Sequence, residues 1–155
     1  MAKKKKENKP WPTNFEILKL AENPDPLLLP MFSHSIRAGF PSPADDYVAD
    51  TLDLNEFLVH RKEATFFVKA KGDSMIGAGI HDGDTLIVDR SITAADGCIV
   101  IAVVDAEFTV KRLRKQKGAI SLLPENPLFN PIEFKEGQEL QIFGVVTNVI
   151  HPLKP

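Results

Sequence analysis

The sequence predicts a mainly β domain with short helices and an extended N-terminal arm. From Thr65 onward, short runs rich in β-branched and aromatic residues alternate with Gly, Asp and Asn/Pro turn signals, as in all-β domains. Ahead of Thr65, prolines interrupt the chain too often for a long helix or strand. The length of 155 residues suits one globular core with a tail.

The arm begins with one candidate helix. In "TNFEILKLAE", Thr13 and Glu16 have the spacing of a capping box, so we expect a short helix that ends before Pro24. Further along, Pro41 and Pro43 in "PSPADD" favour an extended, exposed connector. These features describe an arm rather than part of a core.

The elements of the domain follow in order. Asp53 and Glu56 repeat the capping spacing and predict a second short helix at "LNEFLVH". Turn signals such as Asp82-Gly83 and Lys117-Gly118 separate the runs that come next. We expect strands at "TFFVKA", "DTLIVD", "GCIVIAVV", "EFTVKRL", "AISLLP" and "LQIFGVVTNVI".

Charge and cysteine content exclude several classes of protein. Residues 1–38 carry seven Lys/Arg and four Asp/Glu, whereas the rest carries twelve and seventeen, so the globular part is acidic and unsuited to tracking DNA phosphates. The single cysteine, Cys98, rules out an internal disulfide and is expected to be a small buried hydrophobe. The apolar run that contains this cysteine, "CIVIAVV" (Cys98 to Val104), is far shorter than the roughly 20 residues of a membrane-spanning helix. We expect a cytoplasmic protein with no membrane partner and no direct sequence-specific DNA binding.

A lone serine stands in the glycine-studded stretch "KGDSMIGAGIHDGD". Ser74 does not lie in a nucleophile elbow, because Ile76 replaces the second glycine of that motif. The acidic turn at Asp82 is not an EF-hand loop, because its twelfth position is Thr93. Neither a metal nor a cofactor is expected, because metal-ligand spacing is missing among the four histidines, which are His34, His60, His81 and His151.

A serine can instead be activated by a neutral lysine held in apolar surroundings. Desolvation can lower a lysine pKa by roughly 3 to 5 units from about 10.4, which brings the free base toward neutral pH. Lys111 in "EFTVKRL" is the candidate, 37 positions after Ser74. Strand alternation places Lys111 on the face of Thr109 and Leu113 and opposite Arg112, but the pattern does not say which face is buried.

Four stretches carry a family likeness: "GFPSPADDYVADTLDLNEFL", "FVKAKGDSMIGAGIHDGDTLIVD", "ITAADGCIVIAVVDAEFTVKRL" and "FGVVTNVI". Together they resemble the LexA/UmuD family of self-cleaving Ser-Lys proteases, and in particular its UmuD-type subunits of error-prone DNA polymerases. The likeness runs from about Leu28 to the C-terminus, with the motifs in order. It implies a LexA/UmuD-like β-clip protease domain.

The resemblance implies a role for each matching residue. Ser74 of "GDSM" would be the nucleophile and Lys111 of "FTVK" the general base of a serine endopeptidase. The backbone N–H groups of Ser74 and Met75 would form the oxyanion hole. The scissile bond would be Ala38-Gly39. Cleavage would then divide the chain into an arm, residues 1–38, and a dimerising, polymerase-binding peptidase-like domain, residues 39–155.

The implied function is that of a self-cleaving accessory subunit of an error-prone translesion DNA polymerase in the SOS response to DNA damage. The implied partners are a second copy of the chain in a homodimer, a RecA nucleoprotein filament that stimulates cleavage, and a UmuC-like Y-family polymerase subunit. An apolar stretch of the arm resembles a sliding-clamp contact, and packing of that stretch on its own domain explains it equally well. It comprises Leu28, Leu29, Pro30, Met31, Phe32 and Ser33.

Three alternatives use parts of the same pattern. A LexA-like repressor would add a helix-turn-helix, for which one short helix broken by prolines is too little. A signal peptidase would need a membrane anchor. A non-cleaving polymerase-binding module would keep the fold without the chemistry, and intact Ser74, Lys111 and Ala38-Gly39 argue against it. The long N-terminus, Cys98 and Ala106 depart from the family pattern without touching those residues.

Overall fold

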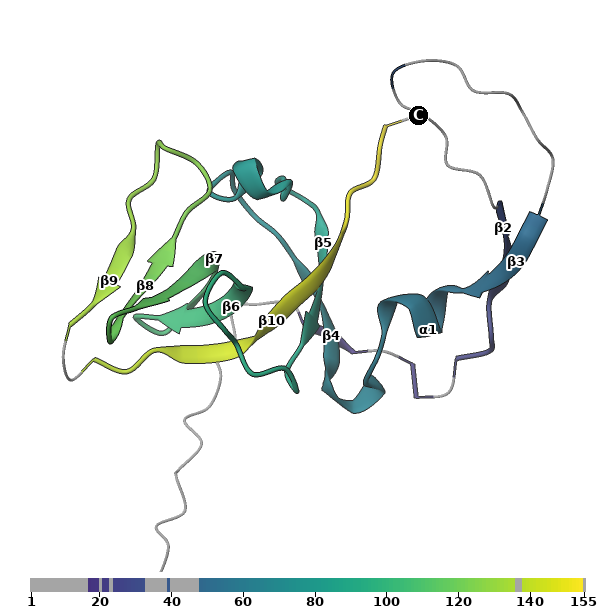
Figure 1. Cartoon of the computed structure of the whole chain (residues 1–155), viewed down its shortest axis with the longest axis horizontal. Coiled ribbons are helices and arrows are strands. Elements are labelled where there is room, and N and C mark those ends of the chain that lie inside the picture. Colours follow the sequence, from purple (N-terminus) through teal and green to yellow (C-terminus); the bar gives the residue numbers. More distant parts are fainter. Residues whose placement is uncertain are drawn as a thin grey trace, which may run out of the picture.

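The computed structural model describes residues 17–19, 21–22, 24–32, 39, 48–135 and 138–154. An antiparallel eight-stranded sheet has the order β1-β4-β5-β10-β6-β7-β8-β9, and a separate two-stranded sheet pairs β2 with β3 (Figure 1). The strands are β1 (Ile17–Lys19), β2 (Leu28–Phe32), β3 (Val48–Asp53), β4 (Thr65–Lys69), β5 (Thr85–Asp89), β6 (Ile99–Val104), β7 (Glu107–Gln116), β8 (Ala119–Leu123), β9 (Ile132–Phe134) and β10 (Gln141–Ile150).

The helical elements of the described chain are short. They are α1 (Leu54–Leu58) and two 3-10 turns, η1 (Lys62–Ala64) and η2 (Ile76–Ala78). The capping prediction for α1 is confirmed, because the Asp53 side chain accepts a hydrogen bond from the backbone N–H of Asn55 at 2.9 Å. No helix in this part of the chain is long and apolar enough to cross a membrane.

The mainly β prediction is confirmed, and all six strands expected from Thr65 onward are present. The helix expected from Thr13 is wrong over its described part, because residues 17–19 form β1. This strand pairs with β4, with Ile17 opposite Val68. Pairing with the edge of β4 gives the backbone N–H and C=O groups of this segment hydrogen-bond partners. An isolated helix of this length would be only marginally stable. The connector predicted at residues 41–46 lies outside the described residues.

Two clusters of buried side chains form the core, and β6 contributes to both. Ile101 belongs to one cluster, with Met75 and Phe143, whereas Val100 and Ala102 belong to the other. Strand alternation sends neighbouring residues to opposite faces, so β6 is buried on both sides. This explains the uninterrupted apolar run in its sequence. Cys98 packs against the second cluster, but it is half-buried rather than buried as expected.

The turn between β6 and β7 contains one departure from the family pattern, Ala106. Asp105 and Ala106 have φ angles of 50° and 64°, so both adopt the left-handed conformation of a tight two-residue hairpin. Glycine reaches this region without steric cost, whereas Ala106 carries its Cβ there. The hairpin keeps Val104 opposite Glu107, which fixes the register of β7 against β6.

β10 joins the two halves of the eight-stranded sheet. Its first residues pair with β6 and its later residues pair with β5, with shifts in register at Ile142/Gly144 and Val146/Asn148. Gly144 stands at the first shift, where a Cβ would meet Val88 Cγ1 at 2.7 Å and the Asp89 carbonyl oxygen at 3.1 Å. The close approach of β5 therefore requires glycine at this position.

We predict that Gly144→Ala destabilises the domain by about 1–3 kcal/mol, because the added methyl group has no space beside β5. Asn148→Ala on the same strand is the control, and a half-buried change of this kind should stay within about 0.5 kcal/mol. Urea denaturation followed by circular dichroism measures both values. Equal stability of the two variants would contradict the close packing of β10 on β5.

Candidate active site

Ser74 lies in the loop that joins β4 to β5. Gly72 begins this loop with a φ of 83°, and its N–H donates a 2.6 Å hydrogen bond to Asp82 Oδ1 across the loop. Met75 is buried in the first core cluster and anchors the chain directly after the serine. The 3-10 turn η2 follows and ends at Gly79, which is left-handed with a φ of 79°. The glycines thus permit two sharp turns that present Ser74 at the rim of the core.

A second segment, around Glu125, holds the serine loop in place. The Glu125 N–H donates to the Ser74 carbonyl at 2.8 Å, and its own carbonyl accepts from the Gly77 N–H at 2.7 Å. The Asn126 side chain donates to the Asp73 carbonyl at 2.9 Å. A Cβ at Gly77 would lie only 2.5 Å from the Glu125 carbonyl oxygen, so this contact also requires glycine. The loop is therefore held by contacts with the segment at Glu125 and Asn126.

Lys111 on β7 points at Ser74. Its Nζ lies 2.9 Å from Ser74 Oγ, 3.0 Å from Thr109 Oγ1 and 3.0 Å from the Val110 carbonyl oxygen. The residue is only 8% exposed. Of the two faces that the sequence left open, the one carrying Thr109 and Lys111 is therefore the one that meets Ser74.

Arg112 occupies the opposite face of β7. Its guanidinium forms an ion pair with Glu125 and donates a 2.7 Å hydrogen bond to the Gly97 carbonyl. Glu125 is the residue that braces the serine loop. Two adjacent residues of β7 thus have different roles. Lys111 contacts Ser74, and Arg112 binds Glu125, which holds the loop that contains Ser74.

Burial lowers the pKa of Lys111 below its ordinary value, because desolvation disfavours the charged ammonium. Within the described part of the chain, no carboxylate forms an ion pair with Lys111 to offset this effect. A neutral amine has two N–H donors and one lone pair. It can donate to Thr109 Oγ1 and the Val110 carbonyl while accepting the Ser74 hydroxyl proton. The protonated ammonium can donate to all three of these oxygen atoms. The surroundings therefore accommodate both protonation states.

A hollow of about 440 Å³ opens beside the two side chains. Among the described residues, the N–H groups of Ser74 and Met75 donate no hydrogen bond, and Ser74 lines the hollow. Leu86, Ile101 and Phe108 contribute apolar walls. The full lining is Lys69, Ala70, Lys71, Ser74, Leu86, Ile101, Glu107, Phe108, Thr109, Val110 and Lys111.

The expected scissile bond and clamp contact fall largely in the arm. Ala38 and Ser33 lie outside the described residues, whereas Gly39 is exposed. The rest of the clamp stretch, Leu28 to Phe32, forms β2 and pairs with β3. Its residues 28–31 are exposed to solvent.

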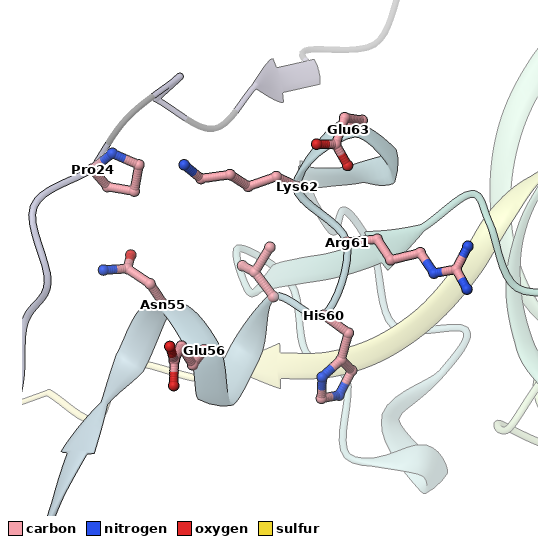
Figure 2. Close-up of a pocket in the computed structure, with 8 residues that line it drawn as sticks. Pro24, Asn55, Glu56, His60, Arg61, Lys62 and Glu63 are labelled. Atoms are coloured by element: carbon pink, nitrogen blue, oxygen red, sulfur yellow. The ribbon is translucent and has the colours of Figure 1, made fainter.

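A second hollow, of about 370 Å³, lies between the arm and α1 (Figure 2). Pro24 faces the helix across it, and Lys62 reaches over to donate a 2.8 Å hydrogen bond to the Glu22 carbonyl. It shares no residue with the hollow at Ser74, and its lining offers no close acid–base pair. The lining is Pro24, Asn55, Glu56, Val59, His60, Arg61, Lys62 and Glu63.

Sequence reasoning missed the groups that support the two candidate residues. Thr109 was placed on the correct face, but its hydrogen bond to Lys111 was not foreseen. The bracing roles of Glu125 and Asn126 had no signal in the sequence, because they come from a loop about 50 positions after Ser74. A hydrogen bond such as that from the Asn126 side chain to the Asp73 carbonyl joins residues far apart in the sequence, so it produces no motif with a fixed spacing.

We predict that stability depends on pH through Lys111. In the unfolded chain a lysine titrates near 10.4, and in the folded chain the pKa of Lys111 is lower. Between these values the unfolded chain binds more protons, so the free energy of unfolding rises with pH. Lys111→Met removes this rise, whereas Lys115→Met, at an exposed lysine of the same strand, retains it.

Urea denaturation between about pH 7 and pH 10 provides the measurement, with intact mass checked after each incubation. The quantity to compare is the difference in unfolding free energy between each variant and the unsubstituted chain. A difference that is independent of pH for Lys111→Met would contradict the lowered pKa.

Comparison with known proteins places this site in a family. The Peptidase S24-like family model matches residues 30–147. Protein SamA of Salmonella typhimurium is 53% identical over 122 residues, covering 79% of this chain and 84% of SamA. Protein MucA of Escherichia coli is 43% identical over 129 residues, covering 81% and 87%. LexA repressor 1 of Geobacter sulfurreducens is 39% identical over 120 residues, covering 77% of this chain and 59% of the repressor.

These matches confirm the resemblance drawn from the sequence motifs. The family model spans most of the chain, and the relatives match over most of its length. The chain therefore belongs to the Peptidase S24-like family, as a UmuD-like member of the LexA/UmuD group.

Proposed function

We propose that this SOS-mutagenesis protein cuts its own chain at Ala38-Gly39, with Ser74 as nucleophile and Lys111 as general base. The observation that carries the proposal is the 2.9 Å approach of Lys111 Nζ to Ser74 Oγ at a buried site. A lysine whose pKa is lowered by desolvation can hold the free amine that serine activation requires. No histidine lines the hollow that contains this pair.

The reaction follows from the contacts of the two side chains. The neutral amine of Lys111 takes the hydroxyl proton as Ser74 Oγ attacks the Ala38 carbonyl carbon. The N–H groups of Ser74 and Met75 stabilise the resulting oxyanion. The Ala38-Gly39 bond then breaks, and Lys111 returns the proton to the departing amine of Gly39. Water hydrolyses the ester left on Ser74, with Lys111 again acting as base, and releases the carboxylate of Ala38.

Cleavage would separate an arm, residues 1–38, from a peptidase-like domain, residues 39–155. The arm carries a net charge of +3 from seven basic and four acidic residues, and the domain carries −5 from twelve and seventeen. Loss of a cationic arm would change which partner surfaces the acidic domain can meet. This charge difference supports the view that cleavage acts as a switch of partners.

The family membership supports a set of partners for that switch. They are a second copy of the chain in a homodimer, a RecA nucleoprotein filament that promotes cleavage, and a UmuC-like Y-family polymerase subunit that receives the shortened form. Exposed β2, with Leu28, Leu29 and Met31, supports a sliding-clamp contact before cleavage. RecA and polymerase partners would place the protein in the cytoplasm.

A non-cleaving polymerase-binding module is the alternative function. It would keep the fold and the partners, and Ser74 and Lys111 would contribute packing only. The buried lysine favours cleavage over this alternative, because burying an amine that has hydrogen bonds but no carboxylate partner costs stability that a purely structural role does not recover.

We predict that the purified full-length chain yields a fragment beginning at Gly39, and that its rate of formation rises between about pH 7 and pH 10. The rise follows from deprotonation of Lys111, whose pKa is lowered by burial. Ser74→Ala and Lys111→Ala should each reduce the rate by about 10³-fold or more. Lys115→Ala, an exposed lysine on the same strand, should cleave at the unsubstituted rate.

Intact-mass spectrometry of timed samples, with and without activated RecA filament, measures the rate and the cleavage position. A chain that stays whole under both conditions would exclude self-cleavage and leave the binding-module function in its place. Cleavage that persists in Lys111→Ala would assign the base to another residue.

A further inference from the structure

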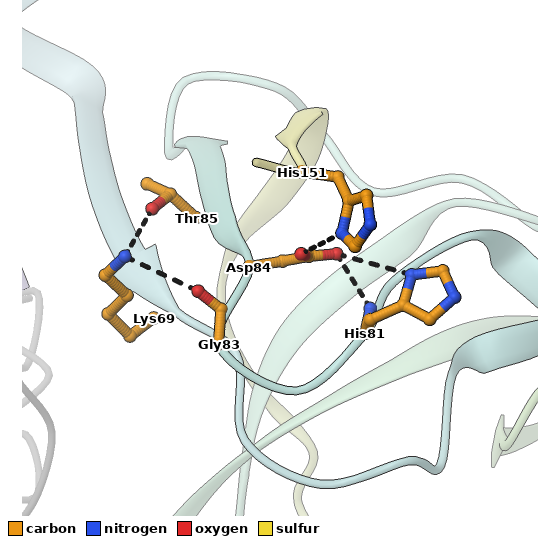
Figure 3. A network of polar contacts seen from close by, with 6 residues as sticks. All are labelled: Lys69, His81, Gly83, Asp84, Thr85 and His151. Carbon is orange, nitrogen blue, oxygen red and sulfur yellow. Dashed lines mark hydrogen bonds and ion pairs between the residues drawn. The ribbon is translucent and has the colours of Figure 1, made fainter. Parts of the chain in front are cut away.

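Two histidines that lie far apart in the sequence meet at a buried aspartate (Figure 3). His81 and Asp84 belong to the turn that precedes β5, whereas His151 follows β10, 67 positions after Asp84. The two imidazole rings lie side by side, with centroids 4.7 Å apart. Sequence spacing gave no metal-binding pattern here, because the pairing of β5 with β10 brings the residues together.

Asp84 is the fixed member of this cluster. Its side chain is 1% exposed, and its Oδ2 accepts a 2.7 Å hydrogen bond from the backbone N–H of His81. Burial would raise the pKa of the Asp84 carboxyl, but the hydrogen bond from His81 and the two imidazoles outweigh burial and hold it below its ordinary value. Each of its two carboxyl oxygens faces one of the imidazole rings.

The histidine side chains are the adjustable members. His151 Nδ1 lies 2.5 Å from Asp84 Oδ1, and His81 Nδ1 lies 3.7 Å from Asp84 Oδ2. Their side chains are 44% and 50% exposed, so both rings can shift while the carboxylate stays in place. Both rings present a nitrogen to the same carboxylate, as Figure 3 shows.

We propose that His81, Asp84 and His151 form a binding site for a divalent transition-metal ion, with Zn²⁺ as the best match. One ligand atom from each residue lies within 4.8 Å of the other two. Two imidazoles and a carboxylate are a donor set that zinc favours, and three protein ligands leave a fourth tetrahedral position for water. The half-exposed rings leave the site open to solvent on that side.

The distances fit an ion after small movements of the rings. Zinc binds imidazole nitrogen at about 2.0–2.1 Å and carboxylate oxygen at about 2.0–2.2 Å, which separates tetrahedral ligand atoms by roughly 3.3 Å. The three ligand atoms now lie within 4.8 Å of one another, so the half-exposed rings would shift by about 1.5 Å or less to reach this spacing. In this arrangement the ion would replace the direct contact between His151 Nδ1 and Asp84 Oδ1.

The site connects the end of β10 to the turn beside the serine loop. Asp82, within the same turn, accepts the hydrogen bond from Gly72 that closes that loop. Lys69 supports the turn from the other side, with Nζ 2.9 Å from Thr85 Oγ1 and 3.4 Å from the Gly83 carbonyl (Figure 3). A bound ion would cross-link residues 81–84 to residue 151 and stiffen this end of the sheet.

Zinc titration of the full-length chain tests the proposal independently of cleavage. Ser74→Ala serves as the parent protein in every sample, so that the chain stays whole whether or not Ser74 acts in cleavage. Isothermal titration calorimetry with ZnCl₂, after chelator treatment, should give saturable binding of one ion per chain. His81→Gln and His151→Gln should each weaken binding by at least about tenfold, since even a residue that only orients a ligand contributes 10- to 100-fold.

His60→Gln is the matched control, because His60 is exposed and lies outside the cluster. It should bind zinc as the parent does. Zinc should also raise the thermal midpoint of the parent and of His60→Gln, and should leave that of the double variant His81→Gln/His151→Gln unchanged. Absence of saturable binding in the parent, or equal binding in the double variant, would reduce the cluster to a hydrogen-bonded His–Asp contact and overturn the proposal.

Discussion

The desolvation of one amine, that of Lys111, is the constraint on which the rest of this structure depends. A lysine exposed to water would carry a proton at neutral pH and could not accept one from a serine. Lowering the pKa of the amine requires neighbours that remove water from it without forming an ion pair with it. Leu86, Ile101 and Phe108 supply those walls from three strands of the sheet. Because proteins pack their interiors densely, a change in any of these strands would reach the amine.

Two consecutive residues of β7 position the two sides of the candidate site. Lys111 faces the hollow, and Arg112 faces away and binds Glu125, whose backbone holds the serine loop. The positions of Lys111 and Ser74 are therefore set by the same strand. A shift of β7 along β6 by one residue would exchange the two side chains and place the permanently charged guanidinium in the hollow. The tight hairpin at Asp105 and Ala106 fixes the register of β7 against β6 and so disfavours that shift.

The strands of the domain could be predicted from the sequence because each carries its own local pattern. "TFFVKA" and "GCIVIAVV" are short β-branched runs between turn signals, and the cap at Asp53 is a local hydrogen bond. β1 could not be predicted, because its conformation is imposed by the edge of β4 and its own sequence favours a helical start at Thr13. Three-residue β9 had no pattern long enough to detect.

The two residues of the candidate site were identified by different routes. Its apolar strand context made Lys111 the candidate partner of Ser74, and the family likeness then supported that pairing. The structure adds the distance and the burial, which no pattern in one strand contains. The meeting of His81 and His151 was beyond sequence reasoning for the same reason. Both depend on strand pairing between segments that are distant in the chain.

The pairing of β1 with β4 has a consequence for the order of events after a cut between residues 38 and 39. In the whole chain, β1 is tethered to the sheet, so its effective concentration at the edge of β4 is high. Once the tether is severed, three residue pairs are too few to hold β1 by themselves. The released β1 then competes with other extended segments for the edge of β4. Any such segment at sufficient concentration can pair with β4 in its place. The cut would thus convert a permanently protected edge into an exchangeable one.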